Sequence, residues 1–222
     1  MKWHWFFRKK YNSDHPDFWK VYVDSFDKKQ RKPIHQTRFV AFDTETTGFD
    51  KKNDRVLSLG AVEIINKTIK VNNTFEIYIK QDVFNPETVK IHGILKEGDL
   101  EKVTELEAIK LFLAYIKNDI LVAHHAGFDY AMVNEMLLRH GLGKLKNEFI
   151  DTGVLFSKSK HIIYREHLKK HYTLDDLCKE LNISMADRHT SIGDALITAI
   201  AFLKIITRLD KIKTLKWDYL MK

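Results

Sequence analysis

Residues 38–48 read Arg-Phe-Val-Ala-Phe-Asp-Thr-Glu-Thr-Thr-Gly, an apolar run that leads into two acids and a polar turn. The apolar part fits a buried strand that ends at Asp43. In extended backbone the side chains of residues i and i+2 lie on one face, so Asp43 and Glu45 project together. Adjacent carboxylates repel each other unless a cation lies between them. The pair therefore indicates either a cation site or the start of a solvated loop, and signals elsewhere in the chain separate the two.

The elements that follow predict the fold class. β-Branched residues dominate residues 56–65 and 68–79, which read as a hairpin joined at Asn66-Lys67. Helical patterns cover residues 104–117, 129–140, 152 onward, 173–181 and 192–209, and short strand-like runs lie at 120–123 and 148–150. Three strands followed by alternating helices and strands predict an α/β fold, in which helices flank a mixed central sheet that contains the β-hairpin.

The charge distribution divides the chain of 222 residues, whose net charge is +7. Residues 1–38 carry ten Lys or Arg against four Asp or Glu, whereas the remaining 184 residues carry 27 against 26. We therefore expect a basic, aromatic-rich arm at 1–36 with one short helix near 16–26, a domain of ordinary size at 37–209, and a short tail at 210–222.

The arm interleaves its basic residues with aromatic side chains. These are Trp3, Trp5, Phe6, Phe7, Phe18 and Trp19. Such a composition can follow a single strand of nucleic acid by phosphate contacts and base stacking. It can also bind an acidic groove on a protein partner, or lie on a membrane surface. These three interpretations stay open.

The single cysteine, Cys178, excludes an internal disulfide and is consistent with a reducing compartment. Its neighbours have the spacing of a buried helical stripe, which favours core packing. No apolar run approaches the roughly 18 residues that span a membrane, and residues 1–10 lack the features of a signal peptide. We expect a soluble, cytoplasmic protein without a transmembrane segment.

Two further segments place acids where a strand gives way to a helix. Residues 124–129 read His-His-Ala-Gly-Phe-Asp, and Asp129 fits a helix N-cap. Residues 189–194 read His-Thr-Ser-Ile-Gly-Asp, in which Ser191 and Asp194 match a capping box. Each acid thus has a structural interpretation, and an isolated His in a polar loop is more often a surface residue. Four acids and one His at strand ends and helix starts together indicate a site, since α/β folds place their sites there.

In this order and spacing, the three segments resemble the exonuclease motifs of the DEDDh family of 3′→5′ exonucleases. The matching residues are 42–48, 124–129 and 189–195, and residues 91–94 (Ile-His-Gly-Ile) and 173–178 (Thr-Leu-Asp-Asp-Leu-Cys) are similar to connecting segments of the group. The resemblance covers about residues 37–208. It is strongest to the group that contains the proofreading epsilon subunits of bacterial DNA polymerase III and their free-standing relatives.

The resemblance implies a ribonuclease H-like fold and a catalytic site with two divalent metal ions. Asp43, Glu45 and Asp194 would bind one ion, and Asp43 with a water-mediated Asp129 would hold the other. Ligands that are all oxygen suit Mg²⁺ or Mn²⁺ and argue against zinc. His189 would be the general base that takes a proton from the attacking water.

The resemblance also implies a pocket for the terminal nucleotide. It would be lined by Thr46, Thr47, His92, His125 and Phe128. His125 stands where the family commonly has Asn, and Ser191 where it commonly has Ala. Neither position is a metal ligand in the family, so we expect the first change to affect nucleotide contact and the second to be a minor packing change.

The expected function is release of nucleoside monophosphates from single-stranded 3′ ends, of DNA in proofreading or repair. RNA trimming of the oligoribonuclease type is an alternative, and a non-catalytic module that tethers a polymerase is another, although all five catalytic residues are present. A phosphatase of the haloacid dehalogenase type would need Asp where Glu45 stands. His167 and His171, with His161 nearby, have the i, i+4 spacing of a helical zinc site. However, no Glu follows the first of them and no third ligand is evident, so a polar helix or loop near the substrate is the favoured interpretation.

Overall fold

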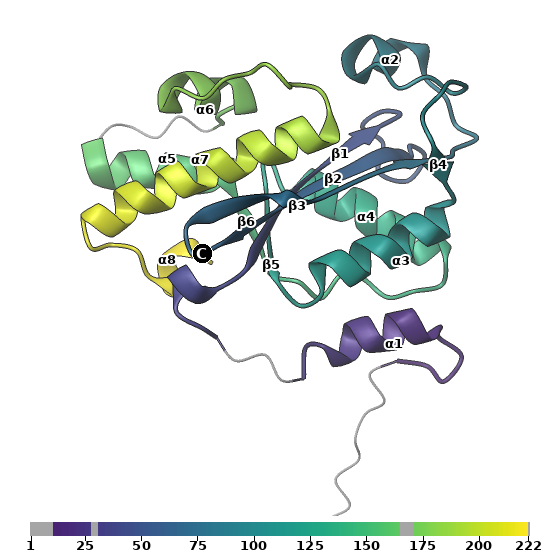
Figure 1. Cartoon of the computed structure of the whole chain (residues 1–222), viewed down its shortest axis with the longest axis horizontal. Helices are drawn as coiled ribbons and strands as arrows, with labels where there is room; N and C mark the ends of the chain where they lie inside the picture. Colours follow the sequence, from purple (N-terminus) through teal and green to yellow (C-terminus); the bar gives the residue numbers. More distant parts are fainter. Residues whose placement is uncertain (1–10, 28–30, 165–170, 222) are drawn as a thin grey trace, which may run out of the picture.

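A six-stranded mixed sheet lies at the centre of the protein, between two layers of helices (Figure 1). The structure is a computed structural model that describes residues 11–27, 31–164 and 171–221. Its strands are β1 (Phe39–Thr46), β2 (Val56–Ile65), β3 (Thr68–Ile79), β4 (Lys102–Val103), β5 (Ile120–Ala123) and β6 (Phe149–Asp151). Their spatial order is β4-β3-β2-β1-β5-β6. The predicted mixed sheet is confirmed.

The first three strands form an antiparallel meander, and β5 and β6 run parallel to β1. The predicted hairpin between β2 and β3 is confirmed with its predicted bounds. Its two turn residues, Asn66 and Lys67, have φ values of 52° and 58°. Left-handed backbone at both positions gives the turn a twist that matches the twist of the strands. β1 extends to Thr46, so the acidic pair lies within the strand.

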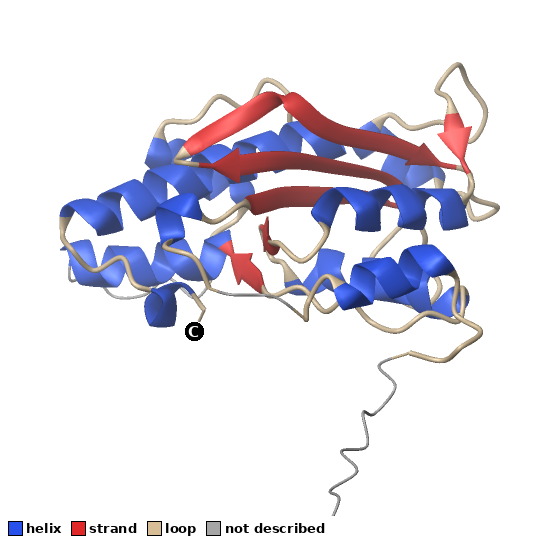
Figure 2. Cartoon of the chain, turned by 60° about the horizontal axis from the view of Figure 1, so that its bottom comes forward, coloured by secondary structure: helices blue, strands red, loops and turns tan. Residues whose placement is uncertain are grey.

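Helices cover both faces of the sheet, as Figure 2 shows. They are α1 (Asp17–Asp24), α2 (Pro86–His92), α3 (Glu105–Ile116), α4 (Gly127–Arg139), α5 (Thr152–Tyr164), α6 (Leu174–Leu181), α7 (Ser191–Lys211) and α8 (Trp217–Leu220), with a 3₁₀ helix at Ile34–Gln36. α3 and α4 cover one face, with α1 beside them, and α5, α6 and α7 cover the other (Figure 1).

The alternation of side chains along β1 divides the core into two clusters. Val40 and Phe42 pack with residues of α1, α3 and α4. Phe39 and Ala41 pack with residues of α5, α6 and α7. Because successive strand residues point to opposite faces, Asp43 continues the second set and faces α7. The strand itself therefore directs the first acid toward the helix that carries the last one.

Part of the predicted arm is packed against the domain. Trp19, Tyr22 and Val23 of α1 are buried in the first core cluster. The Tyr22 hydroxyl donates to Oδ1 of Asn147 at 2.6 Å and accepts from the N–H of Lys146 at 2.8 Å. Trp19 is only 3% exposed, so it is not available to stack on nucleic acid bases.

The predicted tail also contacts the core. Leu220 of α8 is buried in the second cluster, and the ring centroids of Trp217 and Phe39 are 6.1 Å apart. Sequence periodicity did not predict α2, β4 or α8, because each is too short to show a repeat. Cys178 is buried, as predicted. Within the described ranges, no helix combines the length and apolar character needed to cross a membrane.

Candidate active site

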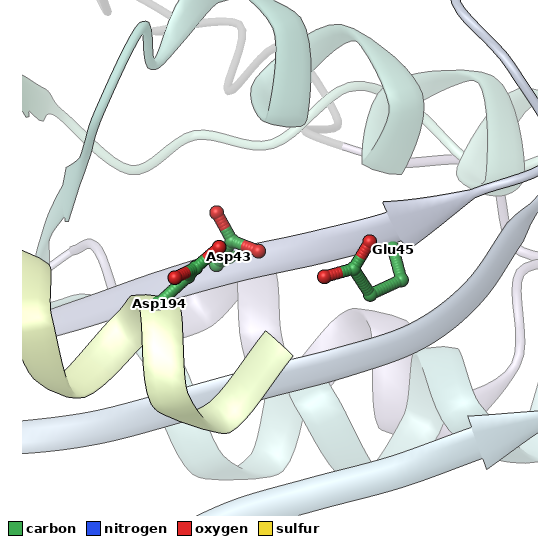
Figure 3. Close-up of side chains that lie close together, drawn as sticks. All are labelled: Asp43, Glu45 and Asp194. Carbon is green, nitrogen blue, oxygen red and sulfur yellow. The ribbon is translucent and has the colours of Figure 1, made fainter. Parts of the chain in front are cut away.

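Three carboxylates converge where β1 meets the start of α7 (Figure 3). One carboxylate oxygen from each of Asp43, Glu45 and Asp194 lies within 4.8 Å of the other two. Asp43 and Glu45 come from the same face of β1, as their i, i+2 spacing predicts. Asp194 joins them from the first turn of α7. Three of the four predicted acids are therefore close enough to share a cation.

A glycine in β2 lets α7 approach the sheet this closely. Gly60 lies opposite Asp43 in the antiparallel pair. A Cβ atom at Gly60 would lie 2.2 Å from the backbone carbon of Ser191, which is far inside van der Waals contact. The buried hydroxyls of Ser58 and Ser191 share a hydrogen bond at 2.9 Å. The start of α7, and with it Asp194, is therefore held against β2.

The start of α7 differs from the predicted capping box. Its N-cap residue is Thr190, whose Oγ1 accepts a hydrogen bond from the N–H of Gly193 at 3.1 Å. Ser191 is already inside the helix, and its hydroxyl is paired with Ser58. Since a buried hydroxyl that loses its partner is destabilising, Ser191 is more than the minor packing change expected from the sequence.

Asp129 is held on the other side of β1. It is buried in the first turn of α4, and its Oδ1 accepts hydrogen bonds from the N–H of Thr44 at 3.0 Å and from the Thr44 hydroxyl at 2.6 Å. The N-cap position of α4 is Ala126, so the predicted cap role of Asp129 is wrong. Asp129 is not one of the three acids that share the 4.8 Å cluster. Its water-mediated contact with a metal ion stays a prediction.

Burial raises the pKa values of Asp43, Glu45 and Asp129, and repulsion from neighbouring carboxylates raises those of Asp43 and Glu45 further. Burial, followed by the charges of Asp129, Asp194 and Glu45, raises the pKa of Asp43 well above its usual range. Burial first, and then the charges of Asp194 and Asp129, raise the pKa of Glu45 to about 7. Burial raises the pKa of Asp129 to about 7, although hydrogen bonds from Thr44 lower it. A divalent cation would favour the ionised forms of all of them.

One oxygen of Asp194 has the features of a metal ligand. Its Oδ1 is buried, and no residue in the described parts of the chain forms a hydrogen bond with it. Its Oδ2 is paired with Arg188 and lies 3.4 Å from the backbone nitrogen of His189. A buried carboxylate oxygen without a partner is costly, and a cation would satisfy it. The donor set is all oxygen, which fits a hard divalent metal ion.

Arg188 is a residue of the site that no sequence pattern predicts. Its Nε donates to Oδ1 of Asp175 at 2.7 Å, and its Nη1 pairs with Oδ2 of Asp194. Its position directly before His189 places it near the site, but the sequence does not reveal which acids its side chain contacts. Only the packing of α6 beside α7 brings these two acids together around the guanidinium group.

Two histidines near the site have left-handed backbone, with φ values of 55° at His125 and 67° at His189. Asn, Asp and His are the residues other than Gly that most often adopt this conformation. This preference gives a physical reason why His125 can replace the Asn that is common in the resembling family. The ring of His125 stacks on that of His124 at 4.4 Å between centroids, and its Nε2 lies 3.1 Å from the carbonyl oxygen of Tyr172.

His189 is exposed beside Asp194, where its backbone nitrogen contacts the carboxylate. Of the three histidines considered for zinc, His171 is exposed, with its ring centroid 6.5 Å from that of His125. The side chain of His161 and all of His167 lie outside the described residues.

The turn after β1 is connected to α2, which was not predicted. The Asn85 side chain donates to the Thr47 carbonyl at 2.9 Å and caps α2 by accepting from Glu87 N–H at 3.0 Å. An Asn followed by Pro is a recognisable helix start, so this signal was present in the sequence.

At the end of α2, His92 Nδ1 accepts from the N–H of Ile94, which leaves the proton on Nε2. Nε2 is buried without a hydrogen-bond partner among the described residues.

The other predicted pocket residues lie around the same turn. The Thr46 hydroxyl donates to the carbonyl of Gly48 at 2.8 Å, which tightens the turn. The ring centroids of Phe128 and Phe49 are 5.7 Å apart, and Phe49 is 82% exposed. Phe49 is a further aromatic residue that was not predicted for the pocket.

Comparison with known proteins identifies the family. A family model described as exonuclease matches residues 40–202, which include every residue of the acidic cluster. The chain belongs to this exonuclease family. The matched span begins inside β1 and ends within α7, so the family pattern covers the elements that build the site.

Two groups of curated relatives match this exonuclease. The chain is 31% identical over 177 residues to DNA polymerase III subunit epsilon of Salmonella typhimurium, covering 75% of this chain and 70% of that protein. It is 33% identical over 175 residues to DNA polymerase III PolC-type of Caldanaerobacter subterraneus. That match covers 78% of this chain but only 12% of the polymerase.

Solved structures share the fold of this exonuclease. Exonuclease I of E. coli in complex with a dA16 oligonucleotide matches with a TM-score of 0.67 and 16% identity, over 79% of this chain and 42% of that one. Exonuclease X in complex with 5′ overhanging duplex DNA matches with a TM-score of 0.58 and 21% identity, over 84% and 98% of the two chains. The predicted ribonuclease H-like fold is confirmed.

The raised pKa values predict how the stability of the metal-free exonuclease depends on pH. A carboxyl group whose pKa is raised by folding stabilises the folded state below its pKa in the unfolded chain, which is near 4. This stabilisation is lost as the pH rises through its pKa in the folded protein. For Glu45 and Asp129 the folded value is about 7. Asp43→Asn removes one charge from the cluster. In EDTA, the melting temperature of this variant minus that of the wild type should therefore increase as the pH rises from 5 to 8.

Thermal melts of the wild type and of Asp43→Asn across this pH range measure the effect. Glu97→Gln, at an exposed position outside the site, is the matched control and should show a constant difference. A pH-independent difference for Asp43→Asn would contradict the raised pKa values.

Proposed function

We propose that this exonuclease removes nucleoside monophosphates one at a time from the 3′ end of single-stranded DNA, with the help of two divalent metal ions. The observation that carries the proposal is the convergence of Asp43, Glu45 and Asp194, with one buried oxygen of Asp194 left without a partner among the described residues. Membership of the exonuclease family supports the reaction class. The relatives that are polymerase subunits, and the neighbours solved with DNA, favour DNA as the substrate.

The acids would divide the two ions between them. Asp43, Glu45 and Asp194 would hold one, while Asp43 and, through water, Asp129 would hold the other. When bound, two Mg²⁺ or Mn²⁺ ions would stabilise both the attacking and the leaving oxygen of an in-line displacement at phosphorus. The buried positions of Asp129 and Asp194 would keep these ligands in place during the reaction.

His189 would accept the proton of the attacking water on its imidazole ring. It lies two residues before the start of α7, and its backbone nitrogen contacts the Asp194 carboxylate. Because the side chain is exposed, it can reach substrate and exchange its proton with solvent after each turnover. An imidazole is the side chain that most often acts as a general base in such a step.

The turn after β1 and the end of α2 would bind the terminal nucleotide. His92 would offer its buried Nε2–H as a donor to an oxygen of the nucleotide. The paired rings of Phe49 and Phe128 would provide an aromatic surface for a base. The backbone of Thr46 and Thr47 would contact the same nucleotide, and His125 would lie near it.

Asp43→Ala should abolish cleavage without unfolding the protein, because Asp43 would contact both metal ions. The test is digestion of matched 3′-labelled single-stranded DNA, mismatched duplex DNA and RNA, with Mg²⁺ and with EDTA. The wild type should degrade single-stranded DNA in Mg²⁺ and leave it intact in EDTA. Faster digestion of RNA would favour the RNA-trimming alternative, and a folded Asp43→Ala protein that still degrades DNA would exclude this metal assignment.

His189→Ala should lower turnover by about 10²–10⁴, the usual contribution of a positioned general base. Its affinity for Mn²⁺, measured from the rise in melting temperature with added metal, should stay that of the wild type, because His189 is not a ligand. His35→Ala, in the 3₁₀ helix before β1, is a control that should leave turnover unchanged. Wild-type turnover of His189→Ala at pH 7 would show that another group activates the water.

The basic residues 1–10 would extend the contact with single-stranded nucleic acid, although a polymerase partner is the competing interpretation. They contain four Lys or Arg and no Asp or Glu. Removal of residues 1–10, which leaves α1 packed against the domain, should raise KM on long strands and leave turnover on short ones unchanged. The slope of log affinity against log salt should shrink by about 0.7 for each phosphate that these residues neutralise in the intact protein. An unchanged slope would favour a protein partner.

A further inference from the structure

We propose that Arg188 is a positioning residue for the metal site. It would hold Oδ2 of Asp194 so that Oδ1 stays available to the metal ion near Asp43 and Glu45. The inference rests on the proposed metal-dependent function, and it adds a residue that acts on the metal through Asp194. The roles proposed above for the acids and for His189 do not include Arg188.

The contacts of Arg188 form a fork between two acids. Nε donates to Asp175 at 2.7 Å, and Nη1 pairs with Oδ2 of Asp194. The side chain of Arg188 is only 17% exposed, and that of Asp194 is 8% exposed. A guanidinium group is planar and presents its N–H groups in fixed directions. With Nε fixed on one acid, Nη1 can therefore restrain the carboxylate of the other.

Asp175 is a fixed anchor because α6 is attached to α7 along its length. Asp175 lies in the first turn of α6, where Leu174 packs with Cys178 and with Ile197 of α7. At the other end of α6, Nζ of Lys204 on α7 donates to the Leu181 carbonyl at 2.8 Å. Both ends of α6 are thus restrained, so the fork connects Asp194 to a rigid part of the fold.

The two oxygens of Asp194 have different surroundings as a result. Oδ2 accepts from Arg188 and lies near the N–H of His189, whereas Oδ1 is buried without a partner in the described parts of the chain. Hydrogen bonds to the non-ligating atoms of a metal ligand commonly set its orientation. The fork also fixes the chain directly before His189. The left-handed backbone conformation of His189 is an uncommon one that neighbouring contacts must maintain. Arg188 would therefore position both a ligand and the segment of the general base.

A different interpretation makes the opposite prediction. If the Arg188 guanidinium merely occupied the position of the cation in the metal-free protein, it would compete with the metal, and its removal would tighten metal binding. Arg188→Lys separates the two ideas because it keeps the positive charge but loses the fork. Under the positioning role, metal binding weakens although the net charge of the site is unchanged.

The test is Mn²⁺ binding to the metal-free protein without nucleic acid, measured by calorimetry and by the electron paramagnetic resonance signal of free Mn²⁺. Arg188→Lys should weaken binding by about 10–100-fold, the usual effect of losing a partner of a metal ligand. Asp175→Asn, which removes the charge of the anchor, should change the affinity in the same direction by less. At saturating Mn²⁺, a remaining loss of kcat in Arg188→Lys would report the displaced His189 segment.

Arg139→Lys is a matched control for the loss of an arginine fork. Arg139 donates to both oxygens of Glu105, at 3.0 and 2.7 Å, between α4 and α3. Its side chain is 25% exposed, and its ion-pair partner Glu105 lies outside the acidic cluster. This variant should bind Mn²⁺ as the wild type does, even if it melts at a lower temperature.

The outcomes separate this inference from the proposed function. Wild-type or tighter Mn²⁺ binding by Arg188→Lys overturns the positioning role, and so does equal weakening in Arg139→Lys. If Arg188→Lys does not fold, Asp175→Asn decides, and unchanged binding in that variant overturns the inference. A wild-type protein that binds no Mn²⁺ and cleaves no DNA refutes the proposed function instead.

Discussion

The close approach of α7 to the sheet is the constraint on which the site depends. Carboxylates from β1 and α7 repel one another, and this repulsion would separate the two elements if nothing opposed it. Apolar packing opposes it, because Phe202 and its neighbours on the 21-residue α7 lie against Phe39 and Ala41 in one buried cluster. The missing side chain at Gly60 then lets the first turn of the helix come close enough to present Asp194. Hydrophobic contacts away from the site thus hold together carboxylates that would otherwise repel each other apart.

Features that depend on local geometry could be predicted from the sequence. The hairpin followed from two β-branched runs joined by a two-residue turn, and the pairing of Asp43 with Glu45 followed from the alternation of a strand. The approach of Asp194 to these acids came only from resemblance to a family. Arg188 was missed because its partners come from two helices whose packing no local pattern reveals. The cap of α7 was misassigned because the Ser191 hydroxyl bonds Ser58 of β2, and Thr190 caps the helix instead.

The N-terminal region shows how composition can mislead. Aromatic and basic residues together favoured nucleic acid stacking, but Trp19 packs against the domain. Composition does not distinguish an aromatic ring that stacks on a base from one that fills a core. Spacing does so better, since Trp19, Tyr22 and Val23 have the i, i+3, i+4 pattern of a buried helical face. The acids of the site were easier to interpret because all four lie at strand ends and helix starts, in the order of the family motifs.

The position of α1 limits which surfaces can be compared between this protein and its relatives. The helix lies before the family span of residues 40–202, yet it covers part of α3 and the segment after α4, where Trp19 lies against Gly143. A relative that shares only the family span must expose or cover this area in another way. A partner that binds a relative there would meet α1 in this protein instead. The family span therefore contains the acidic cluster, whereas this flank of the molecule is built by a helix that lies outside the span.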